Sequence, residues 1–83
     1  MEDEEVINLV LEKLYKQRYL GGLQGVLKSL NDNEIFIRNN QLNRVMAEIK
    51  SNDFAIISKS EDDYQAEISP EGIVYCEDVL MIK

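Results

Sequence analysis

The sequence predicts one domain of the α+β class, mainly helical, with a small antiparallel sheet late in the chain. Two long segments carry apolar residues at i, i+3, i+4 and i+7, the spacing of an amphipathic helix. Two short segments rich in β-branched and aromatic residues enclose a polar turn, as in a hairpin. A chain of 83 residues is too short for more than one hydrophobic core, so 1–83 is treated as a single domain.

The first half of the chain predicts two helices and a short strand. The spacing indicates a first helix over about 5–19 and a second over about 23–31, with Gly21-Gly22 as the stop between them. A β-prone run at 35–37 predicts the strand. The inward residues of the two helices are Ile7, Val10, Leu11 and Leu14, then Leu23, Val26, Leu27 and Leu30.

The second half predicts a third helix, a hairpin and a fourth helix. The third helix covers about 39–51, and its inward residues are Leu42, Val45, Met46 and Ile49. Strands at 54–59 and 64–68 enclose a polar turn. Ser69-Pro70-Glu71 supplies an N-cap, a proline in the first turn and an acid, so a fourth helix is expected over about 70–80.

This order of elements resembles the winged-helix family, a variant of the helix-turn-helix class. The stretch 41–54 looks like the family's recognition helix running into its first wing strand. The stretch 64–73 is similar to its return strand followed by a Ser/Thr-Pro-Glu-Gly helix start. The resemblance implies a three-helix winged-helix domain with a small wing sheet and a C-terminal helix. The acidic wing tip departs from the basic wings that contact DNA, so this wing is not expected in the minor groove.

Charge and cysteine content narrow the classes of function. The net charge is −7, which opposes nucleic-acid binding, although residues 13–50 hold seven basic and only three acidic side chains. The chain has one cysteine and no histidine, so we expect no disulfide, no metal and no cofactor. The acidic N-terminus and the lack of a long apolar run predict a cytoplasmic protein that does not enter membranes.

The resemblance implies a non-enzymatic DNA-binding domain, a transcription regulator that reads the major groove of double-stranded DNA with the third helix. Arginine pairs with guanine and asparagine with adenine, so Asn40, Asn43 and Arg44 are the candidates for base reading. Arg38, Asn39 and Lys50 are the candidates for phosphate contacts. Capping of the third helix is the alternative role for one of Asn39 and Asn40.

The alternative function is a winged-helix module that binds a protein and not DNA. The acidic surface favours it, and the basic middle of the chain favours DNA. The apolar tail predicts a homodimer through the fourth helix, although the same residues could fold back on the first helix. The acids Glu61, Asp62 and Asp63 are interpreted as a solvated turn. The candidates for the dimer interface are Ile73, Val79, Leu80, Met81 and Ile82.

Overall fold

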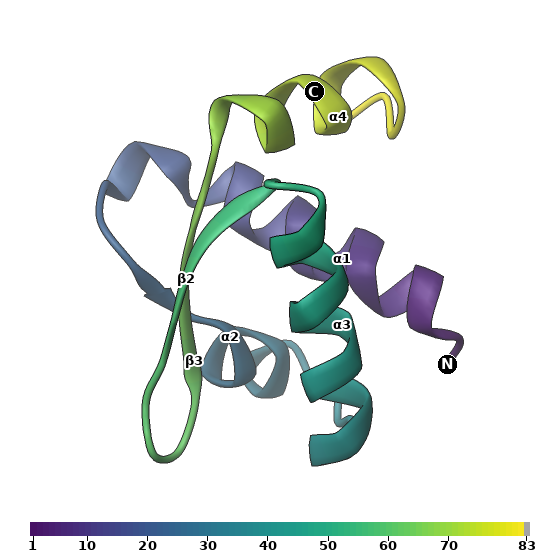
Figure 1. Ribbon diagram of the computed structural model, residues 1–83, viewed down its shortest axis with the longest axis vertical. Helices are drawn as coiled ribbons and strands as arrows, with labels where there is room; N and C mark the ends of the chain where they lie inside the picture. The colour runs from purple at the N-terminus through teal and green to yellow at the C-terminus, as the bar shows by residue number, and fades with distance from the viewer. Residues whose placement is uncertain (83) are drawn as a thin grey trace.

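The computed structural model describes residues 1–82 and confirms the α+β, mainly helical class (Figure 1). Three strands form one antiparallel sheet in the order β1-β3-β2. In Figure 1 the α3 helix lies between the hairpin and the start of α1, and α4 lies across the upper end of the hairpin and of α3. The elements are α1 (Asp3–Lys16), a 3₁₀ turn (Arg18–Leu20), β1 (Gln24–Gly25), α2 (Val26–Asp32), α3 (Asn39–Ser51), β2 (Ala55–Lys59), β3 (Tyr64–Ile68) and α4 (Pro70–Asp78).

The core lies between α1, α3 and the inner face of the sheet. The side chains of Val6, Leu11, Val45 and Ile49 are almost wholly removed from solvent, and so is Ala66 at the centre of β3. Each belongs to the apolar stripe or alternation that its element presents inward. Burial of these stripes is the main source of stability, because a fully buried aliphatic side chain contributes roughly 1.5–3 kcal/mol.

The predicted strand at 35–37 is wrong, and the end of α2 explains why. Glu34 adopts the left-handed conformation (φ 60°), and the Ile35 N–H donates to the Leu30 carbonyl at 2.9 Å. This is a Schellman motif, in which the residue after the turn packs back on the helix. Ile35 and Ile37 are therefore half-buried by helix capping and loop packing, while Phe36 points outward and is 75% exposed.

The third strand of the sheet lies earlier in the chain than predicted. Gln24 and Gly25 pair with β3 and fill the edge of β3 that β2 leaves free. The second helix consequently begins at Val26 and not at 23. Its first turn is capped by the hairpin, because the Asp63 carboxylate accepts hydrogen bonds from the backbone of Leu27 (2.7 Å) and Lys28 (3.2 Å). Asp63 is thus a helix cap, and its interpretation as part of a solvated turn is corrected.

Three helix ends also differ from the prediction. The first helix begins at Asp3, and its α-helical part ends at Lys16. Beyond this end, the Arg18 guanidinium donates a hydrogen bond to the Tyr15 carbonyl. The 3₁₀ turn covers Arg18 and Tyr19, the last two residues predicted as helix. The α4 helix ends at Asp78, two residues before the predicted end. Beyond it Met81 turns left-handed (φ 59°), so the last residues bend back on the helix.

The predicted capping of α4 by Ser69 is confirmed, and it joins the helix to the base of the hairpin. Ser69 Oγ accepts from the Gly72 N–H at 3.1 Å and donates to the Asp53 carbonyl. The Ser69 N–H donates to the Phe54 carbonyl at 3.0 Å. A Cβ atom at Gly72 would lie 2.1 Å from that carbonyl oxygen, so only glycine permits the approach.

Replacing Ser69 with alanine is expected to lower the free energy of unfolding by about 1–2 kcal/mol, because it removes a helix cap and a partly buried hydrogen bond. Urea titration measures the loss. Ser58→Ala, at an exposed serine on β2, is the matched control and should change stability by less than about 0.5 kcal/mol. Equal losses in the two variants would contradict the capping role.

Candidate functional site

The exposed face of α3 carries most of the candidate DNA-contacting residues. Leu42, Val45, Met46 and Ile49 are buried, as the helical periodicity predicts. The opposite face is polar and exposed, and the bounds of α3 coincide with the predicted range 39–51. All six candidates are exposed: Arg38, Asn39, Asn40, Asn43, Arg44 and Lys50.

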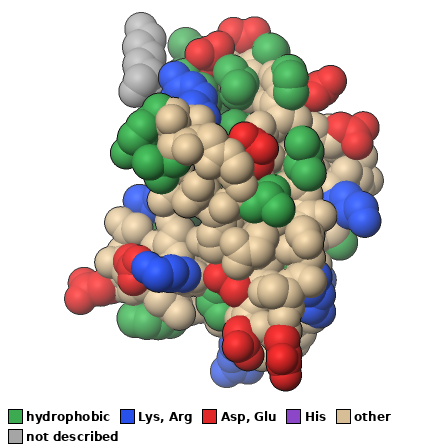
Figure 2. All heavy atoms as spheres, turned by 90° about the vertical axis from the view of Figure 1, so that its left-hand side faces the viewer, with side chains coloured by type: hydrophobic (Ala, Val, Ile, Leu, Met, Phe, Trp, Pro, Cys, Tyr) green, Lys and Arg blue, Asp and Glu red, His purple; other side chains and the backbone are tan. Residues whose placement is uncertain are grey.

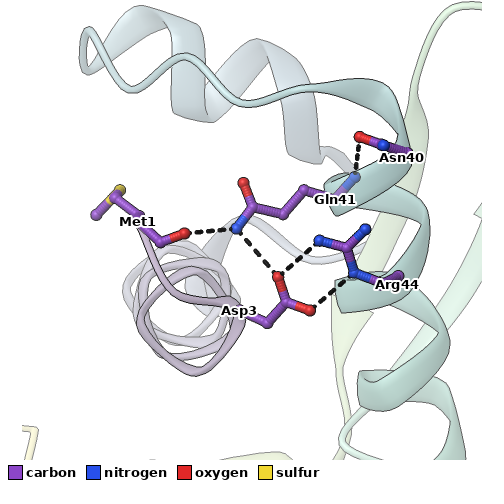
Figure 3. A network of polar contacts seen from close by, with 5 residues as sticks. All are labelled: Met1, Asp3, Asn40, Gln41 and Arg44. Carbon is purple, nitrogen blue, oxygen red and sulfur yellow. Dashed lines mark hydrogen bonds and ion pairs between the residues drawn. The ribbon is translucent and has the colours of Figure 1, made fainter.

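Arg44 is bound to the N-terminal segment of the chain (Figure 3). Its Nε and a terminal guanidinium nitrogen contact the two carboxylate oxygens of Asp3 at 2.9 and 3.1 Å. The neighbouring Gln41 donates from Nε2 to the same carboxylate (3.1 Å) and to the Met1 carbonyl (2.8 Å). A bidentate pair between arginine and a carboxylate fixes the geometry of both groups. The start of α1 is therefore held against the exposed face of α3.

The hydrogen bonds of this pair shift the acidity of both groups. Those from Arg44 first, and from Gln41 next, hold the pKa of Asp3 below its ordinary value of 3.8. The same contact raises the pKa of Arg44. Both side chains remain ionised near neutral pH, so Asp3 compensates the positive charge of Arg44.

The other predicted base readers also have partners. Asn43 accepts a hydrogen bond from the Tyr64 hydroxyl of β3, and Asn40 accepts from the Gln41 N–H. The N-cap residue of α3 is Arg38, so the predicted capping by Asn39 or Asn40 is wrong. The Arg38 side chain itself makes no capping hydrogen bond. Among residues 1–82, no side-chain hydrogen bond or ion pair engages Arg38, Asn39 or Lys50.

The tip of the hairpin forms the other flank of α3. A groove of about 430 Å³ separates the first turns of α3 from the hairpin, with Asn39 and Asn43 on one wall. Lys59 lies over the Tyr64 ring at 5.3 Å, while Glu61 and Asp62 at the tip are exposed. Figure 2, which views the left-hand side of Figure 1, shows acidic and basic side chains together at the lower end of the molecule, and hydrophobic ones over its upper part. The exposed face of α3 thus lies between two acidic segments.

A larger cleft, of about 600 Å³, lies between α1, α3 and α4. One wall is aromatic, because the rings of Phe54 and Tyr75 stack with their centroids 4.5 Å apart. Glu4 of α1 and Glu48 of α3 also line it, and both side chains are exposed. The lining residues come from segments up to 72 positions apart (Asp3 to Tyr75), so no local motif could have revealed this cleft.

The surroundings of Cys76, the one cysteine of the sequence, keep its thiol protonated near neutral pH. Cys76 is buried against the Leu11 carbonyl (3.6 Å), and burial, with a smaller effect from Glu12, raises the pKa of its thiol to about 11. A thiol in that state is a poor nucleophile. Residues 1–82 bring together no group of three cysteine or acidic side chains able to hold a metal ion. None of the helices formed by these residues combines the length and apolar composition needed to cross a bilayer.

The candidate dimer residues at the end of the chain separate into two groups. Ile73, Leu80 and Ile82 are half-buried against the core, and the Ile82 N–H donates to the Cys76 carbonyl at 2.9 Å. Val79 and Met81 are exposed by 61% and 69%. Much of the apolar surplus is thus covered by the chain itself, and homodimerisation stays a prediction.

Comparisons with known proteins provide no relative from which function can be transferred. A scan against protein-family models, a search of curated proteins and a search of solved structures each give no match. The function is therefore inferred from the geometry and the charge of this chain.

The pH dependence of the Asp3–Arg44 pair is a direct test of its geometry. Because the pKa of Asp3 is lower in the folded than in the unfolded chain, its contribution to stability is present above pH 3.8 and is lost as the pH falls through the lowered value. In a carboxyl-carbon NMR titration, Asp3 should titrate below 3.8 in the wild type and closer to 3.8 in Arg44→Gln. Lys50→Gln removes the same charge from the same helix and should leave Asp3 unchanged. An Asp3 midpoint that Arg44→Gln fails to move would contradict the pair.

Proposed function

We propose that this chain is a non-enzymatic, winged-helix-like binding module whose partner is a protein. The observation that carries the proposal is the bidentate contact of Arg44 with Asp3. Base reading requires free guanidinium donors in the major groove. Here two of the five guanidinium N–H donors are directed at a carboxylate of the same chain, and a phosphate backbone would have to approach that carboxylate closely.

The charge around α3 supports the same proposal. Four consecutive acids at positions 2–5 lie at the start of α1, which Gln41 and Arg44 hold against α3. Glu61 and Asp62 lie across the groove on the other flank. Carboxylates within about 8 Å of a phosphate repel it at physiological salt, because that distance is the screening length of the solution. A basic protein surface, in contrast, gains from the net charge of −7.

DNA binding is the second candidate, and one observation favours it. Arg38 and Lys50 stand at the two ends of α3, exposed and without ion-pair partners among residues 1–82. Their positions suit contacts to backbone phosphates. On this candidate Arg44 would have to leave Asp3 before it could reach a base, so removal of Asp3 should improve binding.

A fluorescence-anisotropy titration with random-sequence duplex DNA at 50 and 200 mM salt separates the two candidates. We expect no saturable binding at either salt concentration, in the wild type or in Asp3→Asn. Binding that falls by orders of magnitude between the two salts would contradict the protein-binding proposal, because that dependence is typical of phosphate contacts. Tighter binding by Asp3→Asn would in addition identify Arg44 as a DNA contact.

Photo-cross-linking in the cells that produce the chain supplies the positive test. A photoreactive residue replaces Asn52, an exposed side chain at the large cleft, and in a second variant replaces Ser58, an exposed side chain on β2. One discrete protein adduct is expected from position 52 and none from position 58. Adducts with nucleic acid, or the same adducts from both positions, would contradict a protein partner at this surface.

A further inference from the structure

The cleft between α1, α3 and α4 has an uncompensated negative charge. Asp3 and Arg44 both line it, and their charges cancel in the bidentate pair. Glu4 and Glu48 line it too, and no cation within residues 1–82 forms an ion pair with either carboxylate. A cationic group in the cleft would therefore find two free carboxylates, whereas an anion would be repelled.

The aromatic wall of the cleft suits a planar cation. Phe54 and Tyr75 stack at an interplanar angle of 28°, and both are half-buried and fixed by the junction of α4 with the hairpin. A cation over the face of such a ring gains electrostatic attraction, and a guanidinium also stacks on it. Ile7 adds an apolar contact for an aliphatic stem.

Asn8 adds a hydrogen-bond acceptor to the lining of the cleft. Its side chain lines the cleft, and its Oδ1 is buried with no partner among residues 1–82. Buried acceptors in folded proteins are nearly always satisfied, so such an atom calls for a specific explanation. A donor entering the cleft could satisfy this oxygen once the amide turns toward it.

We propose that this cleft receives an arginine side chain from a basic segment of the partner protein, with the guanidinium between Glu4 and Glu48 and its face against the Phe54–Tyr75 wall. The proposal rests on the proposed function and specifies its partner. Arginine is favoured over lysine because its planar fork matches two carboxylates and stacks on aromatic rings, and because it loses less hydration. The cleft volume, about 600 Å³, is within the range of side-chain and small-ligand pockets.

The probe for this test is N-acetyl-arginine-amide, added to the ¹⁵N-labelled chain and followed by two-dimensional NMR. We expect saturable shifts of the backbone amides of Asn8, Phe54 and Tyr75, at millimolar concentrations because one side chain binds weakly. N-acetyl-citrulline-amide has the same shape without the charge and should produce no saturable shift. Equal responses to the two compounds, or no saturable response to the arginine compound, would overturn the proposal.

Charge variants locate the contact. Glu4→Gln combined with Glu48→Gln should weaken binding of the arginine compound by at least about threefold, since each variant removes one exposed ion pair with the guanidinium. Glu34→Gln combined with Glu61→Gln is the matched control, with the same change in net charge at exposed sites outside the lining of the cleft, and should bind as the wild type does. An equal loss of binding in both double variants would mean that net charge alone explains the effect, and it would overturn the placement of the guanidinium between Glu4 and Glu48.

The outcomes separate this inference from the proposed function. A discrete protein adduct at position 52 together with no response to the arginine compound would overturn the arginine site and leave the protein-binding function standing. Salt-sensitive DNA binding would overturn the function, whatever the response to the arginine compound.

Discussion

The rest of the structure depends on the close approach of α4 to the base of the hairpin. Ser69 joins the two by accepting from Gly72 and by donating to the carbonyls of Asp53 and Phe54, through Oγ and N–H respectively. Gly72 allows this approach because a side chain there would overlap the Phe54 carbonyl. The direction of α4 follows from this contact, and with it the burial of Cys76 against α1. The Ser-Pro-Glu-Gly sequence is thus a packing requirement as well as a helix start.

The same junction shapes the large cleft, the surface that we propose binds a protein partner. It places Tyr75 on Phe54, so one wall of the large cleft is fixed by the core. The opposite wall is fixed by the Asp3–Arg44 pair, which holds α1 and α3 together at the surface. An exposed ion pair contributes little stability, so its main consequence is for charge and position. The pair neutralises the charge of Arg44, the arginine predicted to read DNA. The remaining charges of the lining, those of Glu4 and Glu48, make the cleft negative.

Local patterns predicted much of the fold. The bounds of α3 were predictable because Leu42, Val45, Met46 and Ile49 leave only one helical face for the core. The prediction of a strand at 35–37 was wrong, because the alternation of Ile35 and Ile37 with exposed residues also fits a chain that leaves a helix through a Schellman motif. That motif depends on the left-handed conformation of Glu34. Propensity does not report such a turn, since a glutamate rarely adopts a positive φ.

Contacts between distant residues were beyond prediction from one sequence. Asp63 caps a helix that begins 37 residues earlier, at Val26, and Asp3 binds an arginine 41 residues later. Acidic residues in a turn or at a terminus are usually solvated, and nothing in the local sequence distinguishes these two from their neighbours. The exposed positions of Asn40, Asn43 and Arg44 followed from the helical wheel, but the partner of Asn43 on β3 and that of Arg44 on α1 did not.

The most direct test of this account is a nuclear Overhauser spectrum of the wild type and of Gly72→Ala, in which the ring protons of Phe54 and Tyr75 are observed. We expect strong cross-peaks between the two rings in the wild type, because their centroids are 4.5 Å apart. We expect their loss or marked weakening in Gly72→Ala, where the added methyl group forces α4 away from Phe54. Absence of these cross-peaks from the wild type, or their persistence at full strength in the variant, would contradict this account.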